Sequence, residues 1–390
     1  MIPRRSEQPA RARSAAYGGR LLPLLAHGLR DRLQGAHGRA NARWGHLRPP
    51  PGRGRVLWLK AGADEESVRL GAELLAAIRH KRLDLRLVLT FETDYPPLVD
   101  RALARLEKVG AGYGPCDAPR AVRRALDRLA PLAIIWTGTA ADTNLLAAAR
   151  AQGCRALVVD APAGTAQGVE AAYPATPAQA RTWAGARAGY VAPVADLRTL
   201  LTQAQAEPTL RSLMGGGGLR LWWCHGGESG FQSAFIERWC QSPLATDGVL
   251  LVSPTPGAAD LTISAWDRRA LGAGTVVAVD EPRWYPAVAV AARAQYLAGA
   301  SAPVLWQSLA AGTPAGVSPA LAEALEDRMA APPELAVAAD PDAVMAWWST
   351  VAADDAGARR LGDACRRRFW DERRRAGQVR DELLQRVFDW

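Results

Sequence analysis

The feature that most restricts how this chain can fold is a repeated alternation of short apolar runs with amphipathic helical segments. The first unit of it, VLWLKAGADEES at residues 56–67, runs from an apolar strand through small residues into three acidic side chains. A helical pattern follows, with apolar side chains at positions 68, 70, 74, 75 and 78. Strand, tight loop and helix start in this order predict an α/β domain with a parallel sheet. In such folds the loops that follow the strands bind ligands.

The same alternation continues through most of the chain. Further strands are expected at residues 85–90, 132–136, 156–159, 219–224, 249–253, 261–264, 276–279 and 295–298. Helices are expected at 98–109, 121–129, 144–152, 194–205, 231–240, 285–294, 304–311 and, as a long tail, 340–388. Between about 160 and 208 the pattern is weak, because Ala, Gly, Pro and Thr dominate.

Length and charge limit the classes of protein. A chain of 390 residues suits two domains. The net charge of +9 comes almost entirely from arginine, since lysine occurs only at Lys60, Lys81 and Lys108. An arginine-rich surface suits phosphate-bearing partners such as nucleotides, anionic lipids or nucleic acid. A nucleic-acid-binding module is disfavoured, because no motif matches one and aromatic residues are not interleaved with the basic runs.

The cysteines and the apolar segments exclude several other classes. Five scattered cysteines form neither a CxxC pair nor a Cys/His cluster, so neither a zinc site nor a disulfide framework is expected. This pattern predicts a reducing compartment and no structural metal. No apolar run approaches the length of a membrane span, and the N-terminus lacks the apolar core of a signal peptide.

The first 50 residues form a basic arm. Within it, residues 17–33 carry leucines among arginines and predict an amphipathic helix, broken near Pro23. This helix can lie on a membrane surface or pack on its own domain, and the pattern of its apolar face suits both. Residues 34–55 are rich in Gly, Pro and Arg and predict a connector.

A run of four glycines, Gly215 to Gly218, divides the rest of the chain. Such a run can cradle a phosphate, but no Lys-Ser or Lys-Thr follows it and a strand comes next, so a flexible link is the favoured interpretation. We therefore expect a Rossmann-like domain over 51–210 and a second one over 211–390. Two α/β domains joined by a glycine-rich link and finished by long helices resemble the layout of a GT-B glycosyltransferase, which implies that 51–210 is the acceptor domain and 211–390 the nucleotide-sugar donor domain.

Three acids, Asp64, Glu65 and Glu66, stand at the start of the first helix of the alternation. One interpretation is helix capping, since Asp and Glu are favoured in the first turn, and position alone favours it. The other is a general base at the end of a strand.

Three stretches resemble the Kdo transferases, which transfer 3-deoxy-D-manno-octulosonic acid (Kdo) from CMP-Kdo to lipid A precursors. The segment LRPPPGRGRVLWLKAGADEES resembles the family's linker, strand and HAVSVGE motif. The segment around TGTAADTNLL resembles the strand that leads into METELWPNLL. The segment AVAVAARAQYLAGASAPVLWQSLAAGTPAGV resembles the family's AAADVAFVGGS and NPLEPAALGKPV motifs, with a shortened loop between them.

The resemblance implies roles for individual residues on the acceptor side. Glu66 falls on the glutamate that serves the family as catalytic base, and Lys60 stands where the family has His. Lys60, Glu65 and Asn144 are the expected acceptor-binding residues. The two glutamates of METE are replaced by Gly138 and Ala140, which is a departure from the family's pattern.

On the donor side, HGGESG at residues 225–230 stands where the family has a donor-binding ASTHxGE segment, which makes His225 and Glu228 candidates. The turn with Gly299 and Ser301 is expected to bind the donor's phosphate. Gln307 stands where the family has an acid, and either bonds a donor hydroxyl or is simply a polar residue of a helix face.

The fold implied is GT-B: two Rossmann-like domains that face a central cleft, with C-terminal helices that cross back. The activity implied is transfer of a Kdo-type sugar to a lipid A-type glycolipid, with no cofactor and no metal, at the cytoplasmic face of the bacterial inner membrane. The alternative is a catalytically eroded GT-B protein that acts as a membrane-associated binding protein, and the losses at positions 138 and 140 favour it.

Overall fold

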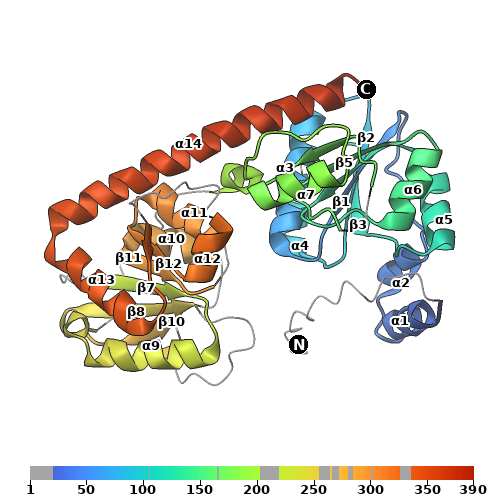
Figure 1. The fold of residues 1–390 in the computed structure, drawn as a ribbon. Coiled ribbons are helices and arrows are strands. Elements are labelled where there is room, and N and C mark those ends of the chain that lie inside the picture. The colour runs from blue at the N-terminus through green and yellow to red at the C-terminus, as the bar shows by residue number, and fades with distance from the viewer. Residues whose placement is uncertain are drawn as a thin grey trace. The chain divides into compact units, whose positions relative to one another are not determined.

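The computed structural model of the chain describes residues 21–104, 106–164, 167–202, 219–253, 264–265, 272–279, 284–299, 302–325 and 335–390. It forms two compact units, and each unit contains one sheet (Figure 1). The first unit comprises residues 1–197 and 378–390, and the second comprises residues 198–377. The expected division at residues 210/211 falls in a part of the chain that the structure does not describe.

The first unit is built on a six-stranded parallel sheet in the order β3-β2-β1-β4-β5-β6. The strands are β1 (Val56–Ala61), β2 (Arg86–Phe91), β3 (Val109–Tyr113), β4 (Pro131–Thr137), β5 (Arg155–Val159) and β6 (Ala171–Tyr173). The helices are α1 (Leu21–Leu33), α2 (His37–Arg43), α3 (Glu65–Lys81), α4 (Pro96–Leu103), α5 (Pro119–Leu129), α6 (Thr143–Ala151) and α7 (Pro177–Gly185). This strand order is that of the doubly wound Rossmann fold, whose strand order reverses between β1 and β4.

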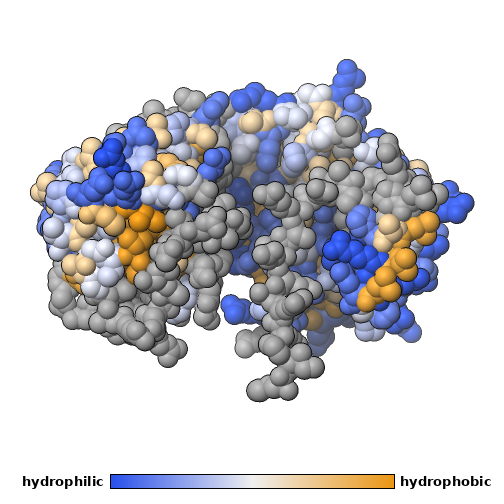
Figure 2. Space-filling view, turned by 90° about the horizontal axis from the view of Figure 1, so that it is seen from below, coloured by the Kyte–Doolittle hydropathy of each residue, from blue (hydrophilic) through white to orange (hydrophobic). Residues whose placement is uncertain are grey.

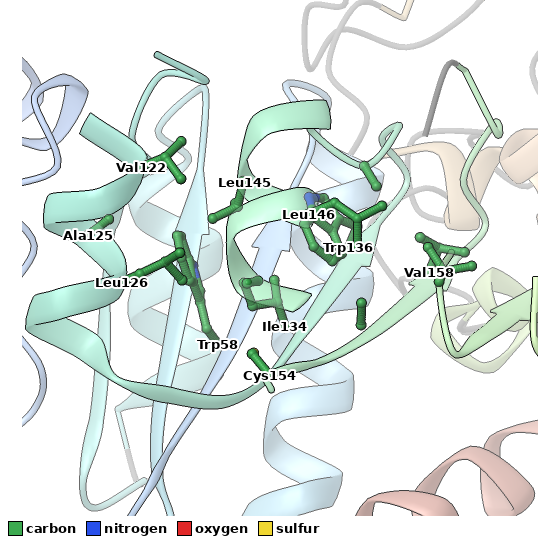
Figure 3. Packing of buried hydrophobic residues seen from close by; sticks show 14 of the residues in the cluster. Trp58, Val122, Ala125, Leu126, Ile134, Trp136, Leu145, Leu146, Cys154 and Val158 are labelled. Atoms are coloured by element: carbon green, nitrogen blue, oxygen red, sulfur yellow. The ribbon is translucent and has the colours of Figure 1, made fainter. Parts of the chain in front are cut away.

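The two faces of this sheet are covered by different helices because neighbouring residues of a strand point to opposite sides. Trp58 and Ile134 point toward α5 and α6 and pack there with Leu126 and Leu145 (Figure 3). On the other face α3 approaches closely through Gly71, where an added Cβ would lie 3.0 Å from the side chain of Leu89. The near-continuous apolar strands predicted from the sequence are therefore buried on both faces, as a parallel sheet requires.

The second unit is built on a seven-stranded parallel sheet in the order β13-β12-β11-β7-β8-β10-β9. The strands are β7 (Arg220–His225), β8 (Gly248–Ser253), β9 (Ser264–Ala265), β10 (Val276–Ala278), β11 (Ala292–Leu297), β12 (Ala315–Val317) and β13 (Leu335–Val337). The helices are α9 (Ser229–Gln241), α10 (Tyr285–Ala291), α11 (Ala302–Ala311), α12 (Pro319–Leu325), α13 (Pro341–Ala353) and α14 (Asp355–Phe388). Short 3-10 helices occupy Leu197–Leu201 and Pro243–Thr246. Here the strand order reverses between β7 and β11.

The long helix α14 belongs to both units. Its first half contributes Cys365 and Phe369 to the core of the second unit. Its last residues pack on the first unit, where Arg82 donates hydrogen bonds to the carbonyls of Val387 and Phe388. The expectation of C-terminal helices that cross back is confirmed, and so are the two Rossmann-like domains of the GT-B fold.

Several expected elements were wrong in type or extent. The helix expected at 98–109 ends at Leu103, and Val109 instead begins the edge strand β3. The helix expected at 285–294 ends at Ala291, because the strand β11 already begins at Ala292. The expected connector at 34–55 contains the helix α2, and the helix expected at 194–205 is a 3-10 helix over Leu197–Leu201.

Helix α1 runs without a break from Leu21 to Leu33, so the interruption expected near Pro23 is not present. The helix packs on α2 through its small and polar side: Asp31 is buried and pairs with Arg43, and Gly28 lies against Trp44. Leu25, Leu29 and Leu33 remain 54%, 61% and 81% exposed. None of the helices in the ranges given above is both long and apolar enough to cross a membrane.

Candidate functional site

The first candidate site is at the carboxyl ends of β1 and β4, where the strand order of the first unit reverses. The loop after β1 is held in place by Asp64, which caps α3 by accepting a hydrogen bond from the Ser67 N–H at 2.8 Å. The hydroxyl of Tyr95 donates to the carbonyl of Ala63 at 2.9 Å and fixes the same loop from the side of β2. The capping role expected for this acidic cluster is therefore filled by Asp64.

Glu66 and Glu65 lie in the first turn of α3, next to this cap. The Glu65 carboxylate is 2.7 Å from Nη2 of Arg69, and both side chains are 39% exposed. A Glu66 oxygen is 3.6 Å from Nη1 of the same arginine, and the Glu66 side chain is 31% exposed. Glu66 is thus a partly exposed carboxylate in the first turn of α3, close to the end of β1, while Asp64 is the N-cap residue. Its role as base stays a prediction.

Lys60 is the last but one residue of β1 and is only 4% exposed. Its Nζ lies 2.5 Å from Oδ2 of Asp142, which also accepts a hydrogen bond from Nε1 of Trp136 at 2.9 Å. Burial alone would lower the pKa of Lys60. The attraction of Asp142, the hydrogen bond to it, and the charges of Glu92 and Asp117 together raise that pKa above its usual value.

Two further carboxylates surround this buried ammonium group. Burial raises the pKa of Glu92, which follows β2, although the charge of Lys60 opposes the shift. Burial also raises the pKa of Asp117, although the N–H groups of Asn144 and Leu145 donate hydrogen bonds to its carboxylate at 3.0 and 2.8 Å. The side chain of Asn144 donates to the carbonyl of Asp117 at 2.7 Å. Lys60 and Asn144 therefore lie in one polar cluster, whose acceptor-binding role stays a prediction.

Asp142, Glu92 and Asp117 were not among the site residues expected from the sequence. Asp142 and Glu92 each come within a few residues of a strand end, which is the signal that could have found them. Asp117 follows β3, a Gly-rich strand of which only the first residue, Val109, lies in a predicted element, the helix at 98–109.

The second candidate site is at the carboxyl ends of β7 and β11, where the strand order of the second unit reverses. The loop after β7 has two consecutive glycines in the left-handed region, Gly226 at φ 74° and Gly227 at φ 96°. A Cβ added to Gly226 would lie 3.4 Å from the backbone nitrogen of Gly299, in the loop after β11. A Cβ added to Gly227 would lie 2.9 Å from the Cβ of Ala298. The glycine-containing loops after β7 and β11 thus approach each other at the point where such sheets bind ligands.

Three of the expected donor-binding residues are in these two loops. His225 ends β7, Glu228 directly precedes α9 and is exposed, and Gly299 follows β11. Ser301 lies outside the described residues. Gln307 is in the second turn of α11, and its buried Oε1 has no hydrogen-bond partner in the described part of the chain. Their donor-binding role stays a prediction.

The His225 ring contacts the rings of Trp223 and Tyr285, with centroids 5.7 and 5.0 Å away. Burial lowers the pKa of His225 to about 4, so its imidazole is uncharged near neutral pH. Its Nδ1 is buried and has no hydrogen-bond partner among the described residues. A neutral ring can donate a hydrogen bond to a phosphate but adds no positive charge.

Gln232, another residue missed in the sequence, holds the loop after β7. Its side chain is fully buried, and its Nε2 donates to the carbonyls of Gly226 at 2.9 Å and Ser253 at 3.4 Å. Because it lies in the second turn of an ordinary amphipathic helix, no sequence pattern marks it.

Known structures share this two-domain fold. UDP-GlcNAc 2-epimerase from Neisseria meningitidis bound to UDP-GlcNAc is 8% identical, with a TM-score of 0.57 over 85% of this chain and 100% of that one. Sucrose-phosphate synthase from Thermosynechococcus elongatus is 14% identical, with a TM-score of 0.55 over 86% and 99%. HepE from Anabaena in complex with UDP is 11% identical, with a TM-score of 0.55 over 86% and 100%.

These similarities show the fold alone, since epimerases and synthases share it. No match to this chain was found among curated proteins. Residues 38–167, which lie in the first unit, match the family model described as 3-deoxy-D-manno-octulosonic-acid transferase (kdotransferase). Residues 38–167 are thus similar to the Kdo transferase family, and the chain as a whole has the two-domain GT-B fold.

Proposed function

We propose that this protein transfers a Kdo-type sugar from CMP-Kdo or a similar nucleotide sugar to a lipid A-type or related glycolipid. It works without a cofactor and sits as a peripheral protein at the cytoplasmic face of the bacterial inner membrane. The observation that carries the proposal is the meeting of the Gly226–Gly227 loop with Gly299 at the ends of β7 and β11.

That arrangement suits the phosphate of a nucleotide sugar. Glycines at positions 226, 227 and 299 keep side-chain volume small where the two loops approach each other, so backbone N–H groups can come close to phosphate oxygens. The first turn of α9 follows directly and adds the positive end of a 13-residue helix. Structures with this fold that contain UDP-GlcNAc or UDP support a nucleotide-bearing donor here.

On the acceptor side, Glu66 is the proposed general base. The acceptor hydroxyl gives its proton to the Glu66 carboxylate while its oxygen bonds to the anomeric carbon of the donor sugar. The bond from that carbon to the phosphate oxygen breaks, and CMP leaves with the bonding electrons. A carboxylate that solvent can reach, in a helical turn whose N-cap is Asp64, can accept this proton.

A membrane surface is the proposed location because of helix α1. Leu25, Leu29 and Leu33 recur every four residues and therefore share one side of the helix, and all three are exposed. Arg30 and Arg32 are exposed on the same helix. Figure 2 shows an apolar streak in orange beside strongly hydrophilic residues at the place of this helix. Apolar side chains flanked by arginines suit a surface of anionic lipid.

One observation favours the eroded binding protein as a second candidate. Gly138, which replaces a family glutamate, has φ 65°, and an added Cβ would lie 2.0 Å from Oγ of Ser67. No carboxylate can be placed there in this loop conformation. This protein therefore cannot use the carboxylate that the family has at that position.

The two functions are separated by offering the purified protein CMP-Kdo and a lipid A precursor in mixed micelles and following product by mass spectrometry. Turnover that falls about 10²–10⁴-fold in Glu66→Gln is expected if Glu66 is the base. Glu73→Gln is the matched control, because it removes an exposed carboxylate of the same helix α3 that has no assigned role in the reaction. Equal loss in both variants would contradict the assignment of Glu66. Absence of both turnover and CMP-Kdo binding in the unaltered protein would favour the eroded binding protein.

A further inference from the structure

A cavity of about 620 Å³ opens on one face of the first unit's sheet, beside the edge strand β3. Its walls come from helix α2, the segment 46–48, strands β2 and β3, and the last turn of α5. None of the residues given a role in the transfer reaction lines it. The cavity therefore needs its own explanation.

The strand register explains why the face is bare at this place. Trp58 of β1 is paired with Val88 of β2, and Val88 is paired with Gly110 of β3. Paired residues of parallel strands point to the same side of the sheet. The side chains of this row therefore become smaller toward the edge, from tryptophan through valine to the hydrogen atom of glycine. Gly112 repeats the pattern in the next row, where Thr90 is its partner. A Cβ added to Gly112 would meet nothing within 4 Å.

The charge of the cavity is positive and uncompensated. Arg48, Arg128 and His46 line it, and no carboxylate is among its lining residues. Within the residues that the structure describes, neither Arg48 nor Arg128 forms an ion pair. Arg124 stands beside them, with Nη1 3.2 Å from Nε2 of His46. The pKa of His46 is lowered by burial and then by Arg124 and Arg128, which agrees with a positive local potential.

The rest of the wall is mixed, with the polar side chains of Asn41, Thr90 and Tyr113 beside an apolar part. Ala42, Leu47 and Val88 line the cavity and belong to the hydrophobic core of the unit. Arginine side chains at the opening and core side chains inside suit a molecule that has both an anionic group and an apolar body. Guanidinium groups match the oxygens of a phosphate ester better than other cations do.

We propose that this cavity binds a phosphorylated amphiphile, with the phosphate on Arg48 and Arg128 and the apolar part against Leu47 and Val88. This inference goes beyond the transfer reaction and does not depend on it. The same chemistry is found in the head group of a membrane lipid and in a soluble phosphate ester. Co-sedimentation with vesicles of phosphatidic acid separates the two sources: a cavity that takes a membrane lipid binds these vesicles and loses this binding in Arg128→Gln, whereas a cavity that takes only a soluble ester binds monomeric dodecyl phosphate and gives the same vesicle binding with and without the substitution.

The test is calorimetric titration of the full-length protein with three probes: monomeric dodecyl phosphate, inorganic phosphate and the uncharged detergent dodecyl maltoside. We expect dodecyl phosphate to bind at least about tenfold more tightly than either of the others, because only it offers both a charge and an apolar chain. Equal affinity of inorganic phosphate would overturn the role of the apolar wall. Equal affinity of dodecyl maltoside would overturn the role of the arginines.

Two variants locate the binding. Arg128→Gln removes a charge at the opening, and we expect it to weaken dodecyl phosphate binding about tenfold or more. Gly112→Leu fills the cavity from the sheet and should abolish binding. Arg123→Gln, on the exposed side of the same helix α5 and outside the cavity, is the matched control and should bind as the unaltered protein does. If Gly112→Leu does not fold, Arg48→Gln takes its place. Unchanged affinity in Arg128→Gln and Arg48→Gln would show that the ligand binds elsewhere.

Discussion

Lys60 at the end of β1 and Asp142 at the start of α6 form a buried ion pair, with Nζ and Oδ2 2.5 Å apart. The pair joins two strand ends at the point where the strand order of the first unit reverses. Its members are 82 residues apart in the chain. Because an ammonium group is costly to bury alone, the pair makes the folding of each strand end depend on the other.

Asp142→Ala should lower the free energy of unfolding by about 3 kcal/mol, because it leaves the Lys60 ammonium buried without its nearest counter-charge. It also removes the acceptor of the Trp136 indole N–H. Urea unfolding followed by circular dichroism measures the change. Asp127→Ala, an exposed acid of α5, is the control and should stay within about 0.5 kcal/mol. A comparably small effect of Asp142→Ala would show that water or another group compensates Lys60.

Glu92→Gln should stabilise the protein near neutral pH. The pKa of Glu92 is raised on folding, chiefly by burial, so the folded protein holds this proton more tightly than the unfolded chain does. The free energy of unfolding therefore decreases as pH rises through the raised pKa of Glu92. At neutral pH the ionised side chain destabilises the folded protein, and glutamine, which carries no charge, does not. Unfolding midpoints in urea at neutral pH and at a pH below the ordinary pKa of glutamate measure this. The gain should vanish at the acidic pH, and a gain that persists there would have another cause.

Residue pattern was sufficient to predict the α/β class, because buried strands such as Leu132–Trp136 and helices such as Asn144–Gln152 carry strong periodic signals. It failed at β3, since VGAGY has little of the β-branched or apolar character of a strand and pairs only along one edge. It also failed at the boundary between α10 and β11. There YPAVAVAARAQYL is apolar except for Arg293 and Gln295, and only the packing of the sheet decides where the helix ends.

The candidate sites could be predicted only in part, because they too depend on contacts between residues that are distant in the sequence. Local sequence identified Glu66 and the glycines after β7, because each lies directly after a strand. It could not show that Asp64 rather than Glu66 caps α3, or that Lys60 meets Asp142, since both depend on side-chain geometry. The role of Gln232 could not be predicted for the same reason. Its side chain stabilises the loop through two carbonyl groups that it contacts only in the folded unit.

Gly138→Ala should destabilise the protein by about 1–3 kcal/mol. The residue has φ 65°, which an L side chain rarely adopts, and the new Cβ would lie 2.0 Å from Oγ of Ser67. Thermal and urea unfolding measure the loss. Gly185→Ala at the end of α7 is the control, because its Cβ would meet nothing within 4 Å and its φ is not positive. If Gly138→Ala is as stable as this control, the loop after β4 can change shape and could hold a larger side chain.

His225 should make stability depend on pH. Its pKa falls from 6.5 to about 4 on folding, so between these values the unfolded chain binds a proton that the folded protein does not. Stability is fully present above 6.5 and decreases as pH falls toward about 4. His225→Phe should remove this part of the pH dependence, as measured by urea unfolding across that range. His80→Phe, on helix α3, is the matched control and should leave the pH dependence unchanged; a slope that survives in His225→Phe would assign it to another group.

The leucines of α1 should decide whether the protein binds a lipid surface. Full burial of a leucine side chain is worth about 1.5–3 kcal/mol, so replacing Leu25, Leu29 and Leu33 together by glutamine should weaken binding to vesicles well over about tenfold. Arg30 and Arg32 should make that binding stronger on vesicles with anionic lipid than on neutral ones, by about 1 kcal/mol for each arginine near the surface. Co-sedimentation with vesicles of phosphatidylglycerol and phosphatidylcholine measures both effects. Leu83→Gln is the control, because Leu83 is 67% exposed outside α1. Vesicle binding that survives the triple replacement would mean that α1 is an ordinary surface helix, and that the protein meets its lipid through another face.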